Sequence, residues 1–178
     1  MKKIKPSIEK KGAILSVSIV LFTVLSDYLS KIIVMENMSL RDSIPIIKNV
    51  LHLTYITNPG AAFGSFSDSR WVFMVASTLM IIGLGALIAF WEDKNILFYV
   101  SASMVLGGGV GNMIDRIFYG EVVDFIDFCA FPELWSWIFN LADSYVCVGV
   151  GLLMIYYVMS EVKHAREEKE KKSEDGEG

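Results

Sequence analysis

The sequence predicts an all-α integral membrane protein with four transmembrane helices. Hydrophobic residues make up 53% of the chain. The mean hydropathy of +0.48 is too high for a water-soluble domain of this size. Four stretches reach the roughly 20 predominantly apolar residues that a helix needs to cross a bilayer. They cover about 12–34, 71–91, 96–114 and 138–159, and with their connections they form one predicted membrane domain over 12–159.

The first apolar stretch has an alternative interpretation as a cleavable signal peptide, because basic residues precede it. Asp27 and Lys31 occupy its last third, where a signal peptide would carry small residues at a cleavage site. Three further apolar stretches follow it. We therefore predict that it is a retained transmembrane helix.

Basic residues predict the orientation of the four helices. Lysines crowd segment 1–11, and basic residues recur after residue 163, whereas the long connections at 35–70 and 115–137 hold few. The positive-inside rule then places both termini in the cytoplasm and both long connections outside. The segment at 160–178 is predicted to be a cytoplasmic tail with a disordered end.

The first outer connection is predicted to contain β structure. Residues 50–57, VLHLTYIT, alternate apolar and polar side chains and are rich in β-branched and aromatic types, which is typical of a strand. The NPG sequence at 58–60 indicates a turn. We expect a small sheet on the membrane surface. In the second outer connection, the tryptophans of FPELWSW suit the membrane interface.

Polar residues gather at the outer ends of the first, third and fourth helices and in the outer connections. Because these helix ends lie at one depth, the side chains could form a single site. The set comprises Asp27, Lys31, Asn58, Asn112, Asp115, Arg116, Asp124, Asp127, Asn140 and Asp143. Structural roles are open to many of them. Asp27 and Lys31 are spaced i, i+4 and can pair, and the asparagines can bond neighbouring helices. The glycines at 107–111 favour close helix packing over a nucleotide loop.

Asp143 is the hardest of these residues to explain by structure alone. The helix dipole gives a carboxylate near a helix N-terminus about 0.3–1 kcal/mol, whereas burial in the membrane costs at least a few kcal/mol. Asp115, Asp124 and Asp127 are candidate partners. Two neighbouring carboxylates share a proton, and such a pair can activate water and polarise a carbonyl. The spacing does not select which acid is the partner.

Five short motifs occur in order along the chain: D-x-x-x-K at 27–31, N-P-G-A-A-F at 58–63, G-N-x-x-D-R at 111–116, V-D-F-x-D at 123–127 and F-N-L-A-D at 139–143. Together, over about 12–159, they resemble bacterial lipoprotein signal peptidase, also called signal peptidase II or prolipoprotein signal peptidase. The resemblance implies an intramembrane aspartic endopeptidase of the bacterial inner membrane. It would remove the signal peptide of diacylglyceryl-modified prolipoproteins, cutting just before the lipidated cysteine.

The same resemblance assigns the site. It implies Asp124 and Asp143 as the catalytic pair, with either acid as the general base. It also implies an extracytoplasmic β-cradle, a short interfacial helix in the second outer connection, inhibition by globomycin-type compounds, and no metal or cofactor. We expect a monomer that contacts membrane lipid and no nucleic acid. The supporting or substrate-binding residues would be Asn58 and Gly60 in an entrance flap, Asn112 and Asn140 around the pair, Arg116, Asp115, and Asp27 with Lys31 on the first helix.

Two other functional classes are compatible with acids near a membrane. A transporter or proton-conducting subunit would use them along a pathway, and a non-catalytic assembly factor would use them structurally. The charges gather at one end of the predicted bundle, however, and none lies at the middle of the second, third or fourth helix. The order of the motifs therefore favours the peptidase.

Overall fold

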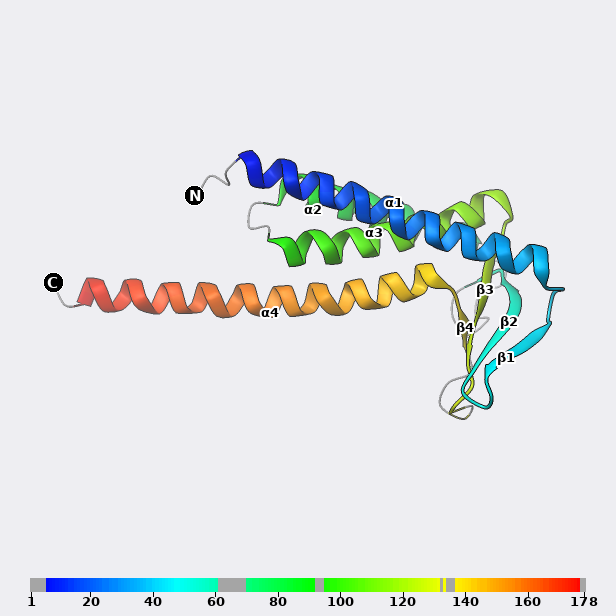
Figure 1. Ribbon diagram of the computed structural model, residues 1–178. Helices are drawn as coiled ribbons and strands as arrows, with labels where there is room; N and C mark the ends of the chain where they lie inside the picture. The colour runs from blue at the N-terminus through cyan, green and yellow to red at the C-terminus, as the bar shows by residue number, and fades with distance from the viewer. Residues whose placement is uncertain (1–5, 61–69, 92–94, 132, 134–136, 177–178) are drawn as a thin grey trace.

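The structure is a computed structural model that describes residues 6–60, 70–91, 95–131, 133 and 137–176. Four helices run side by side, and a sheet lies across one end of them (Figure 1). The helices are α1 (Pro6–Asn37), α2 (Arg70–Phe90), α3 (Ile96–Phe118) and α4 (Leu141–Gly176). The first turns of α1 and the last turns of α4 lie at the end of the bundle away from the sheet.

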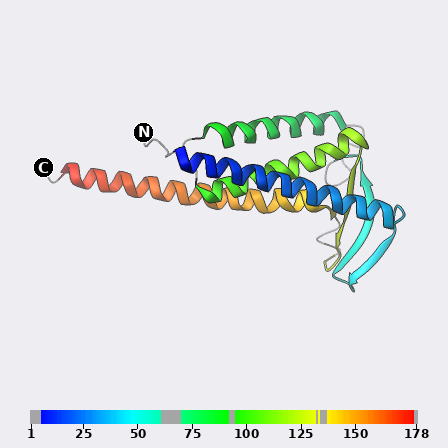
Figure 2. The ribbon, with the colours of Figure 1, turned by 45° about the horizontal axis from the view of Figure 1, so that its top comes forward.

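All four helices are long and apolar enough to cross a membrane, which confirms the predicted four-helix architecture. They differ in burial. In the most apolar window of α3, 67% of the residues are buried inside the protein, whereas none is buried in that of α2. Helix α3 packs against each of the other three helices, as Figure 2 shows from a second side. It is therefore the centre of the bundle, and the other helices present most of their apolar surface to lipid.

Glycines bring α3 and α4 into close contact. A Cβ atom added at Gly108 would run into the carbonyl oxygen of Ala142 and lie 2.8 Å from the Val146 side chain. On α4, a Cβ at Gly149 would lie 2.9 Å from the Ser101 carbonyl oxygen of α3 and 2.6 Å from the Val105 side chain. Small residues that let helix backbones approach are the usual basis of packing in membranes. The predicted packing role of the glycine run is confirmed.

Helix α4 begins later and ends later than the apolar run at 138–159. Asn140 is its N-cap: the Asn140 Oδ1 atom accepts the Asp143 backbone N–H at 2.9 Å, and Asp143 Oδ2 accepts the Asn140 N–H at 3.3 Å. This reciprocal capping box stops the helix from starting earlier. Beyond the membrane, the chain is rich in Glu and Lys with i, i+4 pairs such as Lys163–Glu167. Such residues favour helix. The segment predicted to be a tail with a disordered end is therefore helical as far as Gly176.

The sheet has four antiparallel strands in the order β1 (Ser43–Ile47), β2 (Leu51–Asn58), β3 (Val122–Phe128) and β4 (Ile138–Phe139). The predicted strand at 50–57 is confirmed as β2. The sequence indicated neither β3, in the second outer connection, nor β4, at the first two residues of the predicted fourth helix. Between α3 and α4, the described residues form β3 and β4 and include no helix, while 132 and 134–136 of the predicted interfacial helix region lie outside the described residues.

The strand pairing gives the sheet one apolar and one polar face. Ile44 pairs with Leu53, Leu53 with Ile126, and Ile126 with Phe139, so these side chains share a face. On the opposite face, the Ser43 and Thr54 hydroxyls are 2.8 Å apart. Because side chains alternate along a strand, Asp124 in β3 shares the apolar face with Ile126. The apolar face of the sheet therefore carries Asp124, which lies among the ends of the helices.

Candidate active site at the outer ends of the helices

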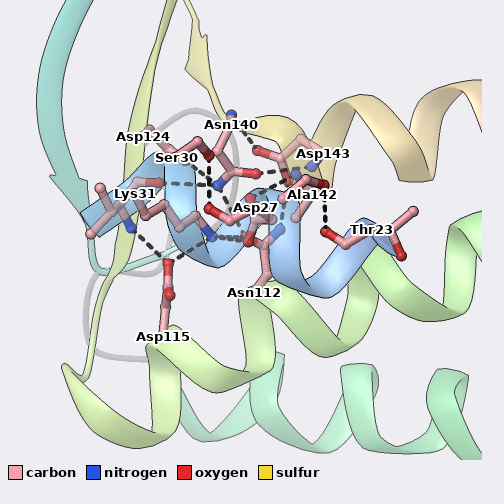
Figure 3. Close-up of polar contacts among 12 residues, drawn as sticks. Thr23, Asp27, Ser30, Lys31, Asn112, Asp115, Asp124, Asn140, Ala142 and Asp143 are labelled. Carbon is pink, nitrogen blue, oxygen red and sulfur yellow. Dashed lines mark hydrogen bonds and ion pairs between the residues drawn. The ribbon is translucent and has the colours of Figure 1, made fainter. Parts of the chain in front are cut away.

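A buried ion cluster joins α1, α3, β3 and α4 (Figure 3). The Lys31 ammonium lies 2.8 Å from Asp27 Oδ2, one turn away on α1, and 2.8 Å from Asp115 Oδ2 on α3. Asp115 Oδ2 also accepts the Val123 backbone N–H of β3 at 3.1 Å. Asp27 Oδ1 accepts the Ala142 N–H in the first turn of α4 at 2.9 Å. One lysine and two carboxylates thus fix the segments that carry Asp124 and Asp143.

Asp124 lies on β3 with only 2% of its surface exposed. Its Oδ1 atom accepts a hydrogen bond from Asn140 Nδ2 at 2.7 Å, and its Oδ2 atom accepts one from Asn58 Nδ2 at 3.1 Å. Both oxygens of this carboxyl group therefore have amide donors, one from β2 and one from the N-cap of α4.

A β-bulge turns Asn58 toward Asp124. The β2–β3 register passes from Leu53 opposite Ile126 to Ile56 opposite Asp124, so β2 has one residue more than β3 in this interval. In a strand that alternates regularly, the five-residue separation from Leu53 would place Asn58 on the opposite face. With the bulge, Ile56 and Asn58 share the face of Leu53 and Asp124. Bulges commonly re-aim a side chain next to a functional site, and this one brings the Asn58 amide to the carboxyl group.

Asn140 joins the two acids. Its Nδ2 group donates to Asp124, and its backbone N–H donates to Asp143 Oδ2. One fully buried residue therefore contacts both carboxyl groups, Asp124 through its side chain and Asp143 through its backbone. Asp143 Oδ1 receives a further hydrogen bond, from Asn112 Nδ2 at 2.7 Å. Asp124, Asp143, Asn112 and Asn140 form one hydrogen-bonded group, which we call the dyad cluster.

Burial controls the ionisation of Asp124. The pKa of Asp124 is raised from 3.8 to about 7, first because burial removes hydration from its carboxylate and second because of the nearby charge of Asp143. Hydrogen bonds from Asn58 and Asn140, and the charge of Lys31, act in the opposite direction and are weaker. Near neutral pH, Asp124 can therefore hold a proton or release it, as a catalytic acid requires.

Other predicted residues are placed beside the cluster or away from it. The Arg116 guanidinium donates to the Asn112 carbonyl oxygen at 3.3 Å and lies over the Phe73 ring, 5.9 Å from its centroid. The Gly60 N–H donates to Asn58 Oδ1 at 3.1 Å, and residues 61–63 of the predicted flap lie outside the described residues. Asp127 is on the polar face, where it accepts from Thr54 Oγ1 at 2.8 Å.

Sequence reasoning missed the groups that hold the acids through the backbone. The Val123 and Ala142 N–H groups anchor the ion cluster to β3 and α4, and no side chain marks them in the sequence. Among the described residues, no group of His, Cys, Asp and Glu is arranged to hold a metal ion.

Comparison with known proteins places the chain in a family. A model of the family described as signal peptidase (SPase) II matches residues 19–159, a range that contains both acids. The chain belongs to the signal peptidase II family. Signal peptidase II is a peptidase family, so membership favours proteolysis over transport or a purely structural role.

Individual relatives agree with this assignment to signal peptidase II. The chain is 42% identical over 144 residues to a lipoprotein signal peptidase of Halothermothrix orenii, covering 80% of this chain and 94% of the relative. It is 38% identical over 149 residues to one of Halalkalibacterium halodurans, covering 84% and 95%. A solved bacterial membrane enzyme superimposes with a TM-score of 0.76 at 34% identity, covering 82% of this chain and 88% of the other.

Proposed function

We propose that the protein is an intramembrane aspartic endopeptidase in which Asp124 and Asp143 activate a water molecule. The observation that carries the proposal is the bridge through Asn140, which hydrogen-bonds both carboxyl groups at one end of helices long and apolar enough to cross a membrane. Burial of Asp124 and its raised pKa support a pair that shares one proton.

The proposed reaction needs no further group for acid–base chemistry. One carboxylate removes a proton from water, which attacks the scissile carbonyl carbon. The other, protonated, carboxyl group donates its proton to the carbonyl oxygen, and a proton then passes to the leaving amine as the C–N bond breaks. Because the pair is coupled, its two protonation steps belong to both acids together.

The proposed substrate is a diacylglyceryl-modified prolipoprotein, cut just before its lipidated cysteine. The names of the relatives and the membrane position of the dyad cluster support it. We place the site near the outer face of the bacterial inner membrane, with the diacylglyceryl chains remaining in lipid. Asn58 and Gly60 would line the entrance, and Arg116 would contact the substrate main chain or head group. Globomycin-type inhibitors would compete for this site, and the enzyme would act as a monomer.

The test is cleavage of a purified diacylglyceryl prolipoprotein in detergent or vesicles. Wild-type protein should release the signal peptide, and Asp124→Asn or Asp143→Asn should each lower kcat by several orders of magnitude, as loss of one member of a catalytic unit does. Asp127→Asn, on the polar face of the sheet, is the matched control and should retain much more activity.

Two results would contradict the proposal. If both variants of the dyad cleave at the wild-type rate while folded, the assignment of the acids is wrong. If precursor without the lipid is cut as fast as lipidated precursor, the proposed substrate class is wrong.

A further inference from the structure

Lys31 reaches the dyad cluster through one intermediate residue, Asn112. An ammonium group has three N–H donors, and three acceptors surround the one of Lys31. They are Asp27 Oδ2 at 2.8 Å, Asp115 Oδ2 at 2.8 Å and Asn112 Oδ1 at 3.1 Å. The Lys31 side chain is 1% exposed. Two of these contacts are ion pairs with carboxylates, and the hydrogen bond from Lys31 is directed at an amide.

The contact with Lys31 determines how the Asn112 amide is oriented. Lysine has donors and no acceptor, so Asn112 must turn its Oδ1 atom toward Lys31. The Nδ2 group then lies on Asp143 Oδ1, at 2.7 Å. Asn140 Nδ2 supports the same orientation at 3.0 Å, but its two hydrogens are shared among Asn112, the Val123 carbonyl and Asp124. Lys31 is therefore the charged donor that holds this amide.

The orientation makes the surroundings of the two acids unequal. Asp143 accepts from Asn112 and from the Asn140 backbone N–H, and it lies in the first turn of α4, where the helix dipole favours a negative charge. Asp124 lies on a strand, without a helix N-terminus of its own. The charged groups around the pair come from two more helices. They are Asp27 and Lys31 on α1, and Asp115 and Arg116 on α3.

We propose that Lys31 is a positioning residue that holds the Asn112 amide with its NH2 group on Asp143, and so keeps Asp143 as the proton-accepting carboxylate and leaves Asp124 as the acid. The inference rests on the proposed function, because it assigns the two roles that the proposed reaction leaves open. It also predicts that Lys31 acts on catalysis through an amide, and not only by neutralising buried carboxylates.

The test separates these two roles of Lys31 with charge-matched variants. Lys31→Met alone would leave Asp27 and Asp115 buried without a cation, and could fail to fold for that reason. Lys31→Met combined with Asp115→Asn removes one positive and one negative charge, so the net charge of the ion cluster is unchanged. Asp115→Asn alone is the control, because it keeps the contact between Lys31 and Asn112.

We expect the double variant to fold in detergent with a kcat on the order of 100-fold below that of Asp115→Asn, the size of effect that misplacement by about 1 Å produces, and with KM little changed. The rate–pH profile of the double variant should differ from that of Asp115→Asn, because the amide donor beside the coupled pair of acids is no longer held. A lysine that only stabilises the fold would shift the thermal unfolding temperature and leave this profile in place.

A second measurement does not depend on activity. In protein labelled with ¹⁵N-asparagine, the Asn112 side-chain amide protons should exchange with solvent more slowly in Asp115→Asn than in the double variant. Equal exchange, or a double variant with the kcat and pH profile of the control, would overturn the inference about Lys31. If the wild type fails to cleave any lipidated precursor, the proposed function fails, and the exchange measurement still decides whether Lys31 holds the amide.

Discussion

Asp124 couples the stability of the protein to pH. Its pKa is about 7 in the folded chain, against 3.8 for an ordinary aspartate, so the folded state holds a proton that the unfolded state releases between these values. The contribution of Asp124 to the free energy of unfolding is therefore fully present below its unfolded pKa of 3.8 and is lost as pH rises through about 7. This follows from the burial of the Asp124 carboxyl group and from the nearby charge of Asp143, which both raise its pKa.

The prediction concerns the difference between wild type and Asp124→Asn. The amide does not titrate, so the variant should gain stability relative to wild type as pH rises from about 4 to about 8. The difference in free energy of unfolding between the two proteins should change by at most about 4 kcal/mol, at 1.36 kcal/mol per pKa unit. Thermal unfolding in detergent at several pH values measures it. A difference that is constant with pH would show that Asp124 does not titrate in this range.

At the scale of single residues, the sequence pointed to the acids and not to their arrangement. Asp124 and Asp127 both looked like candidate partners of Asp143, because the sequence alone did not identify the segment that carries them as a strand. Once 122–128 is β3, two residues separated by three positions face opposite ways. That alternation sends Asp127 to Thr54 on the polar face and Asp124 to Asn140.

At the scale of elements, the contact between α3 and α4 positions both the N-cap and the dyad cluster. Gly108 meets the Ala142 carbonyl, and Gly111 would place a Cβ 2.7 Å from Asp27 Oδ2. Both glycines lie on the α3 face that supports the first turn of α4, so any side chain there would displace the turn that contains Asp143.

We predict that Gly108→Ala destabilises the protein by about 1–3 kcal/mol, the usual effect of overpacking, because a backbone carbonyl cannot move aside as a side chain can. It should also lower kcat by shifting Asp143. Gly85→Ala on α2 is the matched control, since a Cβ there meets nothing within 4 Å. Thermal unfolding and peptide cleavage are the measurements. Equal behaviour of the two variants would show that α4 can retreat from α3 without loss.

The four helices could be predicted because hydropathy over some 20 residues is a local property. The sheet could be predicted only in part. The strand at Leu51–Asn58 has its own alternation, but β3 pairs with it from far along the chain, with Leu51 opposite Phe128, and β4 is only two residues long. The start of α4 depends on a reciprocal pair of hydrogen bonds between Asn140 and Asp143, which hydropathy does not register.

At the scale of the whole molecule, polarity is separated along the bundle. The sheet and the dyad cluster lie at one end, and the long polar continuation of α4 lies at the other (Figure 1). Basic residues near the start of α1 and along the end of α4 indicate that this second end is cytoplasmic. We predict from this that the sheet end faces outward.

Cysteine labelling tests this orientation. In a background with Cys129 and Cys147 replaced by serine, we predict that a cysteine at Lys48, in the exposed turn between β1 and β2, reacts with a membrane-impermeant maleimide in intact spheroplasts. A cysteine at the exposed Glu168 of α4 should react only after permeabilisation. Labelling of both sites in intact spheroplasts, or of Glu168→Cys alone, would show that the predicted orientation is wrong.

The bulge between Leu53 and Ile56 has a consequence for changes in chain length. Strand faces obey parity, so deleting one residue at 54–55 would remove the bulge and leave Asn58 on the face of Leu53 and Asp124. Deleting a second residue would move Asn58 to the other face, while every chemical group of the site stayed in the sequence. The number of residues between Leu53 and Ile56 thus decides which face of the sheet Asn58 takes. Replacing one of these residues by another type is a smaller disturbance than deleting two of them.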